Sequence, residues 1–157
     1  MQIKGYNLND NLVVEIGRFA ILWNCFERFQ CNNNCNTHTI RAVSANITID
    51  RIKQAKLASV LNERRGLVGQ LVQKYIETGL YPGNARRTKD ADDLLMKSFL
   101  EQNNGDVCCG CLLVIYRIRN NLMHGLKCIE ELNDQFYLFE AVNDVLESIK
   151  VNQHEQV

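Results

Sequence analysis

Apolar residues recur every three or four positions along most of this chain, which is the spacing of one face of an α-helix. Five stretches show this pattern, and they are separated by short polar segments. The pattern predicts an all-α fold, a single bundle of about five helices that takes up residues 1–157 as one domain. The apolar lines are Leu12, Ile16, Phe19, Ala20, Trp23 and Phe26; Leu57, Leu61, Val68, Leu71 and Tyr75; Leu95 and Phe99; Cys108, Cys111, Ile115, Ile118 and Leu122; and Leu138, Val142, Val145 and Ile149.

Residues with short polar side chains stand where these helices are expected to begin, since such side chains cap free backbone N–H groups. Segment 31–48 is rich in Asn and has no periodicity, so we expect a loop there, and 79–84 reads as a turn. Residues 152–157 are expected to be a frayed tail. The expected caps are Asn9 or Asp10, Asp50, Thr88 or Asp90, and Asn133 or Asp134, and the fourth helix is expected over about 107–124.

Composition agrees with a helical globular domain. The chain has 157 residues, of which 46% are hydrophobic, and it contains one proline and nine glycines. It has no apolar run of about 18 residues, so we expect no membrane span. The first residues lack the apolar core of a signal peptide, and we expect a cytoplasmic protein.

The formal net charge is zero, but the charges are unevenly distributed. Residues 41–89 carry ten Lys and Arg against three Asp and Glu, whereas residues 90–157 carry five against twelve. The basic segment can meet nucleic-acid phosphates. The other explanation, which we favour as the main one, is that basic helices face acidic helices within the fold. The candidate phosphate contacts are Arg64, Arg65, Arg86, Arg87 and Lys89.

The chain has seven cysteines, which is an odd number, and it is not a small secreted scaffold. Cys108, Cys109 and Cys111 fall within a predicted helix, where cysteine acts as a small apolar residue. We therefore expect reduced thiols in a reducing compartment.

One group of possible metal ligands, Cys25, Cys31, Cys35 and His38, has five, three and two intervening residues. A structural zinc site is built from closely paired ligands, and these spacings do not match that framework. We expect no metal site and no cofactor.

The segment with the clearest chemical potential is Arg119-Asn120-Asn121-Leu122-Met123-His124-Gly125. His124 can exchange a proton near neutral pH, and an arginine nearby can hold a phosphate and stabilise developing negative charge. Gly125 is suited to end the helix, and the negative end of the helix dipole favours a protonated His124. Together these groups suffice for cleavage of RNA without a metal.

Helical geometry places these side chains on different faces. Each residue advances by about 100°, so Asn120 and His124 share one face with Arg117 on its flank, whereas Arg119 lies about 140° from His124. Arg119 must reach across a groove or meet His124 through a second subunit. The alternative explanation is structural: a His before a terminal Gly is a common helix ending, and such arginines often face solvent.

The segment Arg119-Asn120-x-x-x-His124 resembles the Arg-polar-x-x-x-His signature of the HEPN superfamily of small helical domains. The stretch Trp23-Asn24-Cys25-Phe26-Glu27 resembles the aromatic and glutamate pattern of an early helix in those domains. The signature also lies near the end of the fourth predicted helix, with one helix after it, which is the order expected from the resemblance.

This resemblance implies a metal-independent ribonuclease. It assigns phosphate binding to Arg119, proton transfer to His124, and orientation of the substrate to Asn120, with support from Glu27. Arg117 also precedes His124 within the spacing that the family tolerates, so either arginine can be the working one. The resemblance further implies RNA as substrate, a homodimer through the helix carrying Arg119 and His124, and an antitoxin or phage-defence protein as partner.

Two other functions are compatible with the same residues. Some members of the superfamily have lost catalysis and bind nucleotides or proteins, and this chain can be such a module. It can also be a helical interaction domain in which the Arg, Asn and His are incidental.

Overall fold

A computed structural model describes residues 1–63, 86–103, 107–123 and 129–152 of the chain. Within them the polypeptide forms six α-helices, one 3-10 helix and four two-residue strands, so the predicted all-α class is confirmed. The elements, in chain order, are β1 (Gln2–Ile3), β2 (Tyr6–Asn7), α1 (Asp10–Phe29), α2 (Thr37–Ser44), β3 (Ile47–Thr48), α3 (Arg51–Glu63), α5 (Arg86–Glu101), α6 (Cys108–Met123), η1 (Ile129–Gln135), α7 (Phe136–Ser148) and β4 (Lys150–Val151).

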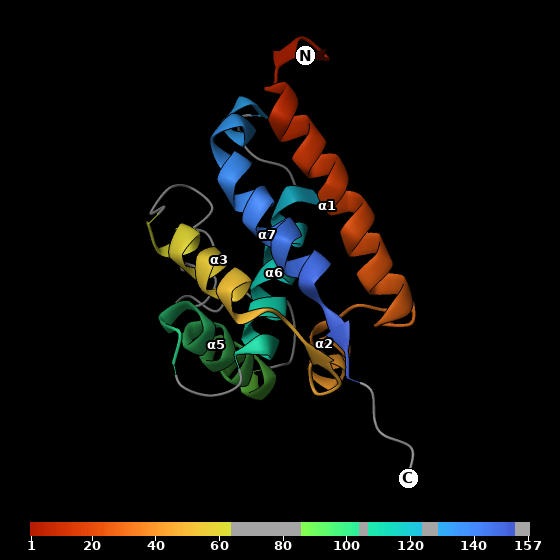
Figure 1. Ribbon diagram of the computed structural model, residues 1–157, viewed down its shortest axis with the longest axis vertical. Coiled ribbons are helices and arrows are strands. Elements are labelled where there is room, and N and C mark those ends of the chain that lie inside the picture. Colours follow the sequence, from red (N-terminus) through yellow and green to blue (C-terminus); the bar gives the residue numbers. More distant parts are fainter. Residues whose placement is uncertain (64–85, 104–106, 124–128, 153–157) are drawn as a thin grey trace.

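Helix α6 lies inside the bundle and the other helices surround it. The long helix α1 runs beside α7 along one edge of the molecule, α3 packs on the other side of α7, and α2 and α5 pack against α6 (Figure 1). Every described side chain of α6 is buried or half-buried. This central position follows from its sequence, because its apolar residues nearly encircle the helix.

Most of the predicted apolar residues that the structure describes are buried, although Ala20 is exposed. In α1 the side chains of Leu12, Phe19, Trp23 and Phe26 are buried, and Ile16 is half-buried. Phe99 in α5 is also buried. Four of the five residues predicted for α6 and three of the four predicted for the last helix are buried as well. No helix within the described ranges is long and apolar enough to cross a membrane.

The prediction of a loop over 31–48 is wrong in its second half, which forms α2 and β3. Asn36 and Thr39 begin α2 with a capping box: the side chain of each accepts a hydrogen bond from the backbone N–H of the other, at 2.9 Å in both cases. Ile40 and Ile47 are buried. Two apolar residues are too few to show a period, so capping and tertiary burial, rather than amphipathic spacing, determine this short helix.

The start of the last helix also differs from the prediction. Residues 129–135 form η1, and α7 begins only at Phe136. Asn133 does not cap α7: its side chain accepts a hydrogen bond from the backbone N–H of Asn9 and donates one to the carbonyl of Asn7. Its side chain is used to hold the N-terminal segment against η1, so it is not available as a cap.

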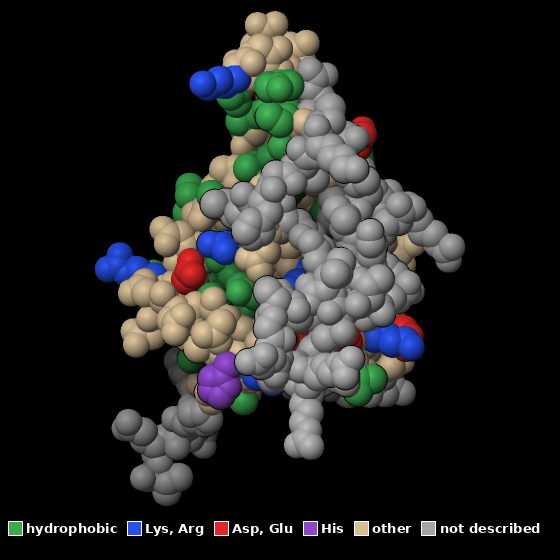
Figure 2. All heavy atoms as spheres, turned by 180° about the vertical axis from the view of Figure 1, so that it is seen from behind, with side chains coloured by type: hydrophobic (Ala, Val, Ile, Leu, Met, Phe, Trp, Pro, Cys, Tyr) green, Lys and Arg blue, Asp and Glu red, His purple; other side chains and the backbone are tan. Residues whose placement is uncertain are grey.

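The C-terminal strand anchors part of the expected tail. β4 pairs antiparallel with β3, and the backbone N–H of Asn152 donates to the carbonyl of Asn46 at 2.8 Å. The expected fraying therefore does not apply to Asn152, and residues 153–157 lie outside the described part of the chain. The N-terminal strands β1 and β2 form a second hairpin, and hydrophobic side chains gather near that end of the molecule (Figure 2).

The six cysteines among the described residues divide into three environments. Cys108, Cys109 and Cys111 are buried in α6, as predicted, and burial raises the pKa of the Cys111 thiol well above its ordinary value. Cys25 is exposed on α1. Cys31 and Cys35 are paired as a disulfide, which contradicts the expectation that all thiols are reduced. The turn after α1, with Asn32 in a left-handed conformation, brings the two residues together.

Candidate functional site

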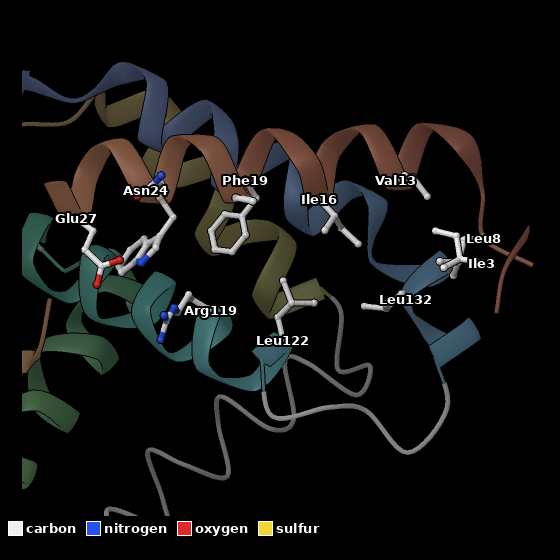
Figure 3. A pocket seen from close by; sticks show the side chains of 12 residues that line it. Ile3, Leu8, Val13, Ile16, Phe19, Asn24, Glu27, Arg119, Leu122 and Leu132 are labelled. Atoms are coloured by element: carbon white, nitrogen blue, oxygen red, sulfur yellow. The ribbon is translucent and has the colours of Figure 1, made fainter. Parts of the chain in front are cut away.

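A groove of about 600 Å³ runs between α1 and α6 (Figure 3). Its polar side chains, Asn24, Glu27 and Arg119, lie at one end, and apolar side chains continue from there toward the N-terminal hairpin. The groove therefore has a polar end and an apolar length, which is the usual composition of a ligand site. Its apolar lining comes from Ile3, Leu8, Val13, Ile16, Phe19, Ala20, Trp23, Leu122 and Leu132.

Aromatic packing holds the two walls of the polar end in place. The indole of Trp23 lies 5.2 Å from the ring of Phe26 and 6.2 Å from the ring of Tyr116 in α6, measured between ring centroids. Aromatic contacts of this kind add to the stabilisation that burial provides. Trp23 thus links α1 to α6 one turn before Glu27, and Phe26 packs beside it in α1. This explains why the Trp-x-x-Phe-Glu pattern positions a carboxylate at the groove.

Arg119 projects from α6 toward this end of the groove (Figure 3). Its Nη1 atom donates a hydrogen bond to Oδ1 of Asn120 at 3.1 Å, and both side chains are half-buried. Asn120 is neutral, so this contact orients the guanidinium without cancelling its charge. Within the described part of the chain Arg119 takes part in no ion pair. The charge is therefore available to an anion that enters the groove.

Arg117 occupies a different environment. Its side chain is 9% exposed, and its positive charge acts on Asp92 of α5, which is 1% exposed and forms an ion pair with Arg41 of α2. Burial raises the pKa of Asp92, and the charges of Arg41 and Arg117 act in the opposite direction. Arg117 does not line the groove. The structure thus separates the two candidate arginines: Arg119 faces the groove and Arg117 joins a buried charge cluster.

The Asp92 cluster was not anticipated from the sequence. Asp92 precedes Leu95, Met96 and Phe99 at helical spacing. This spacing places it on the apolar face of α5, and that position was the available sign of a buried carboxylate. A carboxylate on such a face needs partners, because burial of an isolated charge is costly. Arg41 belongs to the segment that was predicted as a loop, so nothing in the sequence indicated a pairing with Asp92.

The remaining predicted site residues are not placed. His124, Arg64 and Arg65 lie outside the described residues. Arg86, Arg87 and Lys89 belong to the first turn of α5, but only their backbone is described. Of the predicted residues, the structure brings Glu27, Arg119 and Asn120 together.

Comparison of the chain with protein-family models, curated proteins and solved structures found no match. The assignment of chemistry therefore rests on the residues of the groove.

Proposed function

We propose that this protein is a metal-independent RNA endonuclease of the HEPN type. The observation that supports this most directly is that Glu27 and Arg119, which come from two separate segments of the resemblance, line the same end of one groove. Asn120, the second residue of the Arg-Asn-x-x-x-His segment, contacts the guanidinium of Arg119. Sequence spacing alone does not require either relationship.

In the proposed reaction, the ribose 2′-OH attacks the adjacent phosphorus and the bond to the 5′ oxygen breaks. The 2′-OH proton passes to neutral His124, and the same side chain in its protonated form supplies a proton to the leaving 5′ oxygen. Arg119 binds the phosphate and stabilises the charge that develops on its oxygens. The products carry a 2′,3′-cyclic phosphate and a 5′-OH.

The other groups assist this chemistry. Asn120 orients Arg119, and Glu27 can accept a hydrogen bond from a ribose hydroxyl at the polar end of the groove. Arg64, Arg65, Arg86, Arg87 and Lys89 are the proposed contacts to the RNA backbone. A homodimer and an antitoxin or phage-defence partner belong to the same proposal, which places the protein in the cytoplasm.

The test is incubation of the pure protein with mixed tRNA and mRNA in EDTA, beside His124→Ala and Arg119→Ala. We expect fragments that end in 2′,3′-cyclic phosphate from the unaltered protein alone. Cleavage that EDTA abolishes, or that both variants retain, would overturn the proposal. Circular dichroism of each variant checks that loss of cleavage does not reflect loss of the fold.

A second function, binding of a nucleotide or other small molecule without catalysis, is favoured by the apolar length of the groove. The buried indole N–H of Trp23, which also lines the groove, has no hydrogen-bond acceptor among the described residues. A ligand with an acceptor atom can satisfy this donor. This function predicts that a nucleotide raises the melting temperature of the unaltered protein but not that of Arg119→Ala. The nucleotide should be recovered chemically unchanged after the incubation.

A further inference from the structure

The Cys31–Cys35 disulfide closes the turn that connects α1 to α2 (Figure 1). Cys31 is 4% exposed and packs in the hydrophobic core, whereas Cys35 is half-buried. The three residues between them, Asn32, Asn33 and Asn34, are exposed. The bridge therefore ties a surface turn to the core, and Cys35 is the half of it that a reagent in solution can reach.

This turn holds the last turn of α1 in place. The backbone N–H of Asn33 donates a hydrogen bond to the carbonyl oxygen of Glu27 at 2.9 Å, and the backbone N–H of Cys31 donates to that of Phe26 at 3.3 Å. Carbonyl groups in the last turn of a helix lack partners within the helix, so bonds of this kind keep that turn closed. The side chain of Glu27 lines the polar end of the groove. The segment that carries the disulfide thus also positions a residue of the candidate site.

The closed turn depends on its surroundings. Asn32 and Asn33 have φ angles of 52° and 62°, in the left-handed region. Asparagine tolerates this conformation better than most residues, but two in succession need support from the structure around them. On the other side of the turn, α2 has a capping box of its own, formed by Asn36 and Thr39. Breaking the bridge should therefore loosen the end of α1 rather than the start of α2.

We propose that the Cys31–Cys35 pair is a thiol–disulfide switch that controls the position of Glu27 at the groove. In the oxidised form the closed turn holds the end of α1, and Glu27 lines the groove. In the reduced form the turn opens, the hydrogen bond from Asn33 is lost, and Glu27 is no longer held there. Disulfides in a reducing compartment are usually transient, and catalytic or redox-sensing, which agrees with the cytoplasmic location proposed above. The effect on RNA cleavage rests on the proposed ribonuclease function, whereas the opening of the turn does not.

The exchange needs an external dithiol and no other reactant. A thiolate of the dithiol attacks Sγ of Cys35, the S–S bond breaks, and Sγ of Cys31 leaves as a thiolate that takes up a proton. The second thiol of the reductant then displaces Cys35 from the mixed disulfide, and Cys35 takes up the other proton. The protein has gained two electrons and two protons, and the reductant has become a disulfide. An external disulfide reverses the same steps.

The test is hydrogen–deuterium exchange of the full chain, oxidised and after treatment with dithiothreitol, with the state of the pair verified by peptide mass. We expect the amides of residues 30–33 to exchange about tenfold faster after reduction, because the cross-link no longer limits the opening of the turn. Unchanged exchange at these residues in the fully reduced chain would leave the bridge a structural link and overturn the proposal.

The core provides a control within the same experiment. Trp23 is the only tryptophan of the chain, and its packing against Tyr116 does not involve the turn. Its fluorescence emission should therefore be the same in both states. A shift of the emission to longer wavelength on reduction would mean that the core unfolds instead of one turn opening, which contradicts the switch.

Two cysteine variants identify the responsible pair. Cys35→Ser cannot form the bridge, so its exchange at residues 30–33 should equal that of the reduced chain and should not respond to dithiothreitol. Cys25→Ser is the matched control, because Cys25 is an exposed free thiol on α1, and this variant should keep the full response. A response that disappears in Cys25→Ser, or persists in Cys35→Ser, contradicts the assignment to Cys31 and Cys35.

Cleavage of RNA separates the switch from the ribonuclease function. The reduced chain should cleave RNA about tenfold more slowly than the oxidised chain, because a displaced site residue no longer orients the substrate. Cleavage at equal rates in both states overturns the control of the groove. Absence of cleavage in both states, together with the expected change in exchange, overturns the ribonuclease function and supports the opening of the turn.

Discussion

Glu27 of α1 and Arg119 of α6 line the same end of one groove, although 91 positions separate them in the chain (Figure 3). The relationship depends on Trp23, whose ring packs against Phe26 in α1 and against Tyr116 in α6. The groove therefore has a hydrogen-bond acceptor, Glu27, on one wall and a cation, Arg119, on the other. This arrangement gives the proposed site its polarity, and it leads to predictions that separate the site from its structural support.

Replacement of the two neighbouring arginines should have different consequences. Arg119→Ala should remove RNA cleavage or ligand binding and leave the free energy of unfolding nearly unchanged, because Arg119 is half-buried and paired only with neutral Asn120 among the described residues. Arg117→Ala should lower the free energy of unfolding, because the Arg117 side chain is buried and its positive charge acts on buried Asp92. Urea unfolding and a cleavage assay on both variants check this. Equal stability losses would contradict the separation.

The buried Asp92 should make stability depend on pH in the acid range. Its pKa is raised in the folded protein, chiefly by burial, so the folded state holds this proton more strongly than the unfolded state does. The resulting stabilisation is complete below the ordinary aspartate pKa of about 3.9 and is lost as the pH rises through the folded-state pKa. Asp92→Asn cannot ionise, so its stability relative to the unaltered protein should increase with pH. Urea midpoints at a series of pH values measure this, and the opposite trend would mean that Arg41 and Arg117 dominate.

The cysteines should differ in reactivity. Brief treatment of the native protein with iodoacetamide should modify Cys25, which is exposed, and leave Cys108, Cys109 and Cys111 unmodified. Cys111 is fully buried, and its raised pKa keeps it protonated, which is the unreactive form of the thiol. Peptide mass spectrometry resolves each site, and labelling of Cys31 and Cys35 should require prior reduction. Modification of the α6 cysteines at the rate of Cys25 would show that α6 is not enclosed.

The contact between α1 and α7 should depend on Asn143. This side chain is fully buried in α7, and its Nδ2 atom donates to the carbonyl oxygen of Glu15 at 2.9 Å and to the carboxylate at 2.7 Å. Asn143→Ala should lower the free energy of unfolding by about 1 kcal/mol, because it leaves two half-buried acceptors of Glu15 without their donor. Glu147→Ala, which removes an exposed partner of Arg18 at the same contact, is the control and should cost less than about 1 kcal/mol.

Periodicity in the sequence determined the class of fold and most of its core. The apolar spacing in α1, α6 and α7 identified buried residues such as Phe19, Ile115 and Val142, because an amphipathic face has to be buried wherever the helix packs. The likeness of two short segments to the HEPN pattern also selected Glu27 and Arg119. The buried faces and the two site residues could both be identified because they depend on which residues are close together along the chain.

Tertiary structure alone decided which groups meet. Arg117 and Arg119 both precede His124 within the spacing that the resemblance tolerates, and only the packing of α1, α2 and α5 around α6 directs one to Asp92 and the other to the groove. Helix α2 and the Cys31–Cys35 disulfide escaped prediction because a capping box, a turn and two buried isoleucines leave no periodic trace. Long-range contacts depend on how faces pack in space, and spacing along one helix contains no information about its neighbours.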